Sequence, residues 1–108
     1  MARSVIVNLV ELGPADDGRQ IAVGLADTVV LRLPESGAAG YGWDIALDGP
    51  GRVADDRIEQ PAGPIAGAAL IRRLALALES AGRVVVRAAR HSPWDRTVEH
   101  YRVELDVG

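Results

Sequence analysis

Apolar and polar residues alternate along this chain with a period of two, and the pattern recurs up to the last residues. The clearest example is the C-terminal stretch, where charged residues separate Tyr101, Val103, Leu105 and Val107. Successive side chains of an extended strand point to opposite faces, so such alternation is typical of a strand with one buried face. The recurrence of short alternating stretches predicts an all-β sandwich of about seven strands.

Further stretches show the same extended pattern. The apolar sets that share a face are Val5, Val7 and Leu9; Val29, Leu31 and Leu33; Tyr41, Trp43, Ile45 and Leu47; and Val84, Val86 and Ala88. A short extended piece is also expected over residues 19–23. Clusters of Gly, Pro and Asp over residues 13–18 and 48–51 predict turns between these stretches, because these residue types favour turn conformations.

The segment from Ala68 to Ser80 fits two interpretations. Its Ala and Leu residues favour a helix, and Gly82 suits the position just after a helix end. Leu74, Leu76 and Leu78 also alternate as a strand would require. Propensity alone favours the helix, whereas a lone helix would leave a strand position of the sandwich empty. On these residues alone, both interpretations remain open.

Composition narrows the class of protein. The chain has 108 residues, which predicts a single domain over residues 1–108. It contains no Cys, so it has no disulfide framework, no thiolate metal site and no cysteine nucleophile. The net charge of −3 argues against a nucleic-acid partner, which would normally require a basic face.

The sequence predicts no membrane association. No apolar run approaches the roughly 18 residues that a membrane-spanning helix needs. Asn8 interrupts the short apolar run near the N-terminus, and no small-residue cleavage site of a secretory signal follows it. We therefore expect no membrane partner and a cytoplasmic location for the chain as given, unless it was trimmed from a precursor.

The two Trp residues occupy different contexts. Trp43 shares a face with Ile45, which predicts a place in the core. Trp94 follows Pro93 in a polar segment, and Pro93 cannot contribute a donor to a strand ladder. A large ring on a Pro-stiffened loop suits an anchor in a protein interface. A ring folded back onto the sandwich edge fits the same residues equally well.

Catalytic and metal sites have little support. Ser92 adjoins His91, but neighbours in an extended chain point to opposite sides, so the imidazole cannot serve as a base for the hydroxyl. His91, Asp95, Glu99 and His100 are possible metal ligands by type, yet their spacing specifies no coordination geometry, and a solvated charged face is the preferred interpretation. We expect no enzyme, no metal and no cofactor.

A Gly-rich segment lies between two predicted strands and reads Leu33-Pro34-Glu35-Ser36-Gly37-Ala38-Ala39-Gly40-Tyr41-Gly42-Trp43. It resembles the Asn-Pro-Thr-Thr-Gly-Tyr/Phe-x-Trp segment of the chagasin-like inhibitors of papain-family cysteine peptidases. A later segment, Arg90-His91-Ser92-Pro93-Trp94, resembles the Arg-Pro-Trp loop of that family. Ala81-Gly82 matches a turn of the family, and this register aligns the family's Gly-x-Gly-Gly loop with Gly67-Ala68-Ala69-Leu70. The same register makes Leu74, Leu76 and Leu78 the inward face of a strand.

The resemblance implies an immunoglobulin-like β-sandwich in which three loops at one end enter the cleft of the peptidase. By match, these loops are residues 35–40 at the catalytic centre, 63–70 along the cleft and 91–96 at the cleft wall. The peptidase-binding residues that the resemblance implies are Ser36, Gly37, Ala38, Ala39, Gly40, Gly67, Ala68, Ala69, Leu70, Arg90, Pro93 and Trp94.

The function implied by this resemblance is reversible, non-covalent inhibition of papain-like cysteine peptidases by a monomer that needs no cofactor. The chain departs from the family pattern at several contact positions. Ala38 and Ala39 replace both Thr residues, Leu70 replaces the last Gly of Gly-x-Gly-Gly, and Ser92 replaces the Arg of Arg-Pro-Trp. The alternative is therefore an immunoglobulin-like module that binds a different protein partner and has lost peptidase inhibition.

Overall fold

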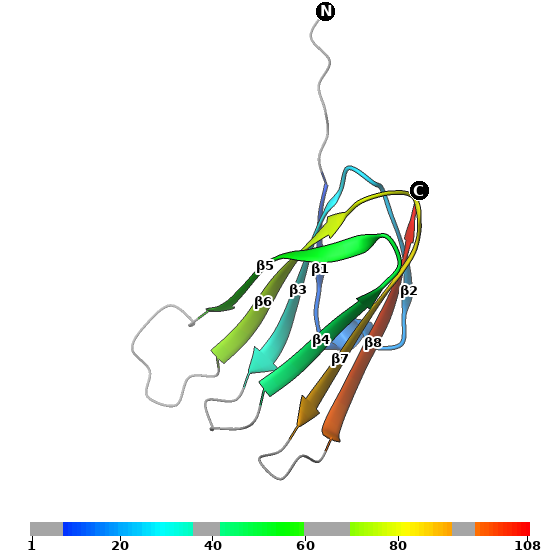
Figure 1. Ribbon diagram of the computed structural model, residues 1–108. Coiled ribbons are helices and arrows are strands. Elements are labelled where there is room, and N and C mark those ends of the chain that lie inside the picture. The colour runs from blue at the N-terminus through cyan, green and yellow to red at the C-terminus, as the bar shows by residue number, and fades with distance from the viewer. Residues whose placement is uncertain (1–7, 36–41, 60–69, 92–96) are drawn as a thin grey trace, which may run out of the picture.

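The computed structural model describes residues 8–35, 42–59, 70–91 and 97–108, except for the side chains of residues 97 and 98. These residues form two four-stranded sheets that face each other (Figure 1). In spatial order, the first sheet contains β1 (Leu9–Leu12), β3 (Thr28–Glu35), β6 (Leu70–Leu78) and β5 (Gly51–Glu59). The second sheet contains β2 (Gln20–Val23), β8 (Thr97–Val107), β7 (Gly82–His91) and β4 (Gly42–Asp48). The predicted all-β, immunoglobulin-like sandwich is confirmed.

The strand order shows which connections stay within one sheet and which cross to the other. β1 is parallel to β3 and β2 is parallel to β8, while the other neighbouring strands are antiparallel. β5 and β6 are neighbours in the first sheet, and β7 and β8 are neighbours in the second. β3 and β4, although consecutive in the chain, belong to different sheets.

The core lies between the sheets and is built from the residues that the alternation places on one face of each strand. Its buried members are Leu12, Val23, Val29, Leu31, Leu33, Trp43, Leu74, Leu76, Val84, Val86, Ala88, Tyr101, Val103, Leu105 and Val107. Ile45, Leu47 and Leu78 are partly buried against this cluster. The predicted inward faces of β3, β4, β7 and β8 are confirmed, whereas Val5, Val7 and Tyr41 lie outside the described residues.

The segment that propensity assigned to a helix is strand β6, so the propensity-based interpretation is wrong and the strand register is confirmed. β6 lies between β3 and β5 and pairs with both. Leu74 and Leu76 are 0% and 4% exposed, respectively. The two ladders and the buried face stabilise the extended form over the weak intrinsic helix preference of Ala and Leu.

Strand β5 was not predicted. It lies at an edge of the first sheet and carries a register shift between Val53 and Asp55. A bulge of this kind moves later side chains to the other face, so the period-two pattern breaks in the sequence. Charged residues fill most of the strand, as is common where an exposed edge must not pair with another chain.

β1 turns the opposite face inward from the one that the alternation suggested. Leu9 is 59% exposed, while Leu12 is 4% exposed and Val10 packs against the core. Leu9 therefore lies on the outer face of the sheet, although the alternation suggested that it faces the core. Because β1 is an edge strand of four residues, its pairing with β3 fixes its register more strongly than its own sequence does.

Helical structure in the described part of the chain is confined to the 3-10 turn η1 (Pro14–Asp16) within the predicted turn at residues 13–18. No helix there is long and apolar enough to cross a membrane. The second predicted turn joins β4 to β5, and Gly49 adopts a φ of +96° in it. Only glycine adopts such a left-handed conformation without strain, which explains its place in this turn between the two sheets.

Candidate functional site

The ends of six strands meet at one end of the sandwich, which we name the loop-bearing end. In the first sheet, Glu35 at the end of β3 pairs with Leu70 at the start of β6, and Glu59 at the end of β5 pairs with Ile71. In the second sheet, His91 at the end of β7 pairs with Gly42 and with residue 97. Residues 36–41, 60–69 and 92–96 are therefore attached at a common end, which lies at the bottom of Figure 1.

Most of the predicted peptidase-binding residues fall in these three connecting segments. Outside the described residues are Ser36, Gly37, Ala38, Ala39, Gly40, Gly67, Ala68, Ala69, Pro93 and Trp94. Leu70 and Arg90 are described. Leu70 opens β6 opposite Glu35 and is partly buried, and Arg90 lies one residue before the end of β7. The structure defines the surroundings of Leu70 and Arg90, and their roles toward a partner remain predictions.

Arg90 is enclosed by groups of its own chain. Its side chain is 18% exposed, and the guanidinium carbon lies 4.8 Å from the centroid of the Trp43 ring. One terminal nitrogen donates a hydrogen bond to the backbone oxygen of Pro34, and the other lies 3.5 Å from a carboxylate oxygen of Glu99. A cation over an indole ring contributes about 0.5–2 kcal/mol, and more as the pair is shielded from water. Arg90 is thus part of the framework below the loops.

A second arginine near the loop-bearing end, Arg72, lies on β6 of the first sheet. It donates two hydrogen bonds to Asp56, of 2.5 and 2.7 Å, and a third of 3.1 Å to the backbone oxygen of Trp43. The hydrogen bonds from Arg72 hold the pKa of Asp56 below its ordinary value, against the opposing effect of burial. The same hydrogen bonds to Asp56 raise the pKa of Arg72.

Glu35 is the one buried acidic residue in the described part of the chain, with 8% of its surface exposed. Its Oε2 lies 3.5 Å from Nη1 of Arg72, although neither that oxygen nor Nε of Arg90 has a hydrogen-bond partner among the described residues. A buried carboxylate is costly without a nearby cation, because burial removes its hydration. Arg72 therefore holds Glu35 in place where β3 leads into residue 36.

Sequence reasoning placed Glu35 at the start of the first loop but missed its ion pair, and it missed Arg72 and Asp56 at this end. A signal for Arg72 and Glu35 was present in the alternation. Arg72 stands two residues before Leu74 on the inward face of β6, and Glu35 stands two residues after Leu33 on the inward face of β3. Charged residues in inward register at paired strand ends indicate a buried ion pair. The bulge in β5 hides Asp56 from the same argument.

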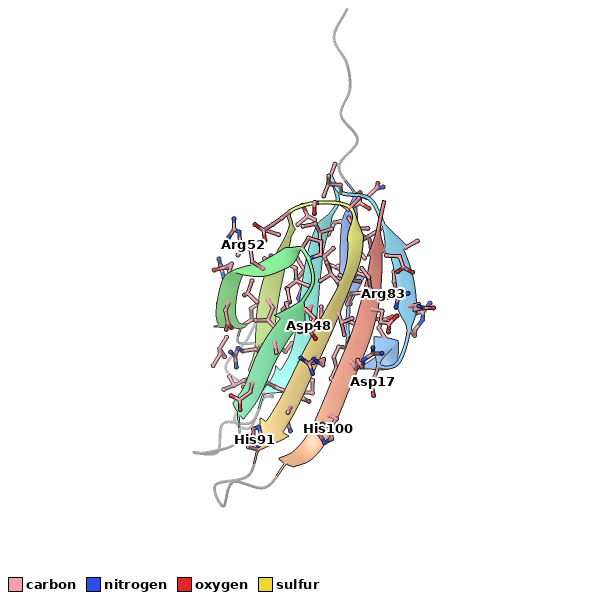
Figure 2. The ribbon with its side chains drawn as sticks, turned by 45° about the vertical axis from the view of Figure 1, so that its right-hand side comes forward. Asp17, Asp48, Arg52, Arg83, His91 and His100 are labelled. Carbon is pink, nitrogen blue, oxygen red and sulfur yellow. The ribbon has the colours of Figure 1, made fainter. Side chains whose placement is uncertain are left out.

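The two histidines lie on neighbouring strands of the second sheet, His91 on β7 and His100 on β8. Figure 2 shows His91 and His100 near the loop-bearing end of β7 and β8, while Arg52 lies toward the opposite end. Nε2 of His91 lies 2.9 Å from a carboxylate oxygen of Asp44. Of the four residues considered as metal ligands, Asp95 lies outside the described residues. Within the described part, no three His, Asp or Glu residues are grouped so that they could hold a metal ion.

Comparison with known proteins gives structural neighbours but no sequence relatives. No family model and no curated protein sequence matches the chain. The crystal structure of the cysteine protease inhibitor EhICP2 from Entamoeba histolytica superimposes with a TM-score of 0.85 at 15% identity, covering 97% of this chain and 100% of the inhibitor. The solution structure of amebosin matches with a TM-score of 0.67 at 14% identity, over 94% of this chain and 98% of amebosin.

A third neighbour has been solved in a complex with another protein. PbICP-C, in its structure in complex with falcipain-2, matches with a TM-score of 0.51 at 10% identity, over 98% of this chain and 94% of the other. At these identities the likeness shows the fold alone. The chain therefore has the fold of the cysteine protease inhibitor EhICP2 over nearly its whole length.

Proposed function

We propose that this chain is a reversible protein inhibitor of papain-like cysteine peptidases. The observation that carries the proposal is the common attachment of residues 36–41, 60–69 and 92–96 at one end of a sandwich with the fold of cysteine protease inhibitors. PbICP-C, which shares the fold, forms a complex with falcipain-2. We extend both observations to this chain and expect its own loops to block the cleft of a peptidase.

In this proposal the three segments enter the active-site cleft of the peptidase together. Residues 36–40 approach the catalytic centre, and their small side chains leave the backbone free to come close to a catalytic thiol. Gly67, Ala68, Ala69 and Leu70 lie along the cleft, and Trp94 covers the cleft wall. Binding forms no covalent bond and needs no cofactor, and the chain catalyses no reaction of its own. A preformed sandwich below the loops lowers the entropic cost of binding, because the strands that carry the loops are already in place.

Enzyme kinetics with papain test the proposal. The purified chain should raise the apparent KM for a small peptide substrate without changing kcat, and dilution should restore full activity. A variant with Arg52→Ala, at the opposite end of β5 from the loops, should inhibit as strongly as the unchanged chain. A folded chain that inhibits neither papain nor a cathepsin-like peptidase would contradict the proposal and support the alternative of a module with a different partner.

A further inference from the structure

The three connecting segments are attached to the sandwich in different ways. Residues 60–69 join two strands of the first sheet, and residues 92–96 join two strands of the second sheet. Residues 36–41 connect one sheet to the other. The placement of 60–69 relative to 92–96 therefore depends on how the two sheets are held together at the loop-bearing end. If three loops must fit one cleft, this inter-sheet contact matters for binding.

The layer between the sheets changes character toward the loop-bearing end. On β7, the inward residues Val84, Val86 and Ala88 are apolar and buried, and the next inward residue is Arg90. On β6, the inward residue that follows Leu74 toward the loops is Arg72, and the partly buried Leu70 comes after it. Apolar contacts have no preferred direction, whereas hydrogen bonds to a carbonyl depend on both distance and angle. Polar contacts can thus define the relative position of the two sheets more sharply than apolar packing alone.

Arg90 makes such contacts across the two sheets. Its hydrogen bond to the Pro34 oxygen joins β7 of the second sheet to β3 of the first. The indole Nε1 of Trp43 on β4 donates to the same oxygen at 2.7 Å. Pro34 lies beyond Leu31, the last residue of β3 that pairs with β1. Two donors from the opposite sheet therefore bind the part of β3 that continues past its edge partner.

The reverse connection comes from the first sheet. Arg72 donates to the backbone oxygen of Trp43, which belongs to the second sheet. Each sheet thus supplies an arginine that binds a backbone oxygen of the other, and Trp43 takes part in both connections. We name these four residues, Pro34, Trp43, Arg72 and Arg90, the inter-sheet lock.

We propose that Arg90 is a positioning residue for peptidase binding, which holds the two sheets in the relative placement that lets all three segments enter one cleft. This inference rests on the proposed function for its partner. Arg90 acts through Pro34 and Trp43 and makes no contact with the peptidase. It differs in this respect from the direct binding role that the resemblance implied.

The variants are chosen to separate the lock from general effects on charge and stability. Arg90→Met keeps an apolar stem but removes every donor, and Arg90→Lys keeps the charge and a donor without the planar guanidinium. Arg87→Met is the matched control, because Arg87 lies on the same strand, faces outward with 56% of its side chain exposed, and pairs with Asp48. Papain inhibition should weaken about tenfold for Arg90→Met, by less for Arg90→Lys, and not for Arg87→Met.

Distances between spin labels measure the sheet placement directly. The chain has no Cys, so pairs of introduced cysteines can be labelled without side reactions. One pair, Ile58→Cys and His100→Cys, joins β5 to β8 near the loop-bearing end. The control pair, Arg52→Cys and Asp106→Cys, joins the same two strands at the opposite end. Arg90→Met should shift and broaden the first distance distribution while leaving the second unchanged.

Each alternative has its own outcome. Weaker inhibition with unchanged distances would show that Arg90 contacts the peptidase, which overturns the proposal. Equal broadening of both distributions would show loss of general stability, and altered distances without weaker inhibition would show that sheet placement does not matter for binding; either result also overturns it. If the unchanged chain inhibits neither papain nor a cathepsin-like peptidase, the proposed function is contradicted, and the distances still decide whether Arg90 holds the sheets in place.

Discussion

Trp43 connects the core to the loop-bearing end. The residue is 4% exposed, its indole donates to the Pro34 oxygen, and its ring lies below the Arg90 guanidinium. Trp43 therefore combines apolar packing in a largely aliphatic core with polar contacts to two other strands. The sequence predicted the burial of Trp43 from its alternation with Ile45, but not its polar partners, because these come from other strands.

Replacement of Trp43 should therefore affect stability. Trp43→Ala leaves a cavity and removes a donor to Pro34, so the free energy of unfolding should fall by about 3–5 kcal/mol. Urea denaturation followed by far-UV circular dichroism measures this change. A loss below about 1 kcal/mol would contradict the assignment of Trp43 to the core.

Trp94 should behave in the opposite way if it is the anchor of the third loop. Truncation of an aromatic anchor costs about 2–4 kcal/mol of binding energy, so Trp94→Ala should weaken papain inhibition roughly 30- to 1000-fold. The melting temperature should remain nearly unchanged. Normal inhibition combined with much earlier melting would show instead that Trp94 packs onto the sandwich.

The ion pair of Asp56 with Arg72 predicts a pH dependence of stability. Because the pKa of Asp56 is lower in the folded chain than its ordinary value of 3.8, folding favours the ionised carboxylate. The stabilisation is present above the unfolded-state pKa and is lost as the pH falls through the folded-state pKa. Melting of the unchanged chain and of Asp56→Asn should differ at neutral pH and converge in acid. A difference that stays constant down to pH values of about 2 would contradict this role.

At the scale of elements, predictability follows burial. β7 and β8 were predicted because each buries one whole face, which fixes a period-two pattern in the sequence. β5 escaped prediction because it is a charged edge strand with a bulge. The Leu- and Ala-rich sequence of β6 suits both a helix and a strand, and only pairing on both sides decides between them. The same limit applies to the site. The partners of an inward charge such as Arg72 can be identified only when the position of the opposite sheet is known.

The turn that leads from β4 of the second sheet to β5 of the first offers a test at this scale. A Cβ at Gly49 would come within 2.1 Å of the backbone oxygen of Arg83, and the residue has a φ of +96°. Gly18 has a φ of +80°, but a Cβ there would meet nothing within 4 Å. Gly18→Ala should thus cost about 1 kcal/mol from backbone strain alone. Gly49→Ala should cost at least about 1–3 kcal/mol more, because its Cβ also collides with Arg83. Equal shifts in melting temperature would contradict the close approach of Arg83 to this turn.

The whole molecule is a sandwich whose two ends differ in kind. Toward the loop-bearing end, the apolar core gives way to the inter-sheet lock and the Glu35–Arg72 pair. Such a framework holds the six strand ends in fixed places. The arrangement agrees with a pattern in the sequence, where the landmarks of the sandwich resemble the inhibitor family more closely than the loop residues do. A preorganised end that carries three connecting segments suits a protein that binds a cleft.

Protection of the catalytic thiol of papain tests this account most directly. Alkylation by iodoacetamide requires access to the cleft, so its rate reports whether the cleft is occupied. With the chain in excess, alkylation should slow in proportion to the fraction of papain bound, and it should recover when the complex is diluted. Trp94→Ala should protect only at correspondingly higher concentration. If papain forms a complex with the chain while its thiol is alkylated at the rate of the free enzyme, the loops do not occupy the cleft, and the central claim is wrong.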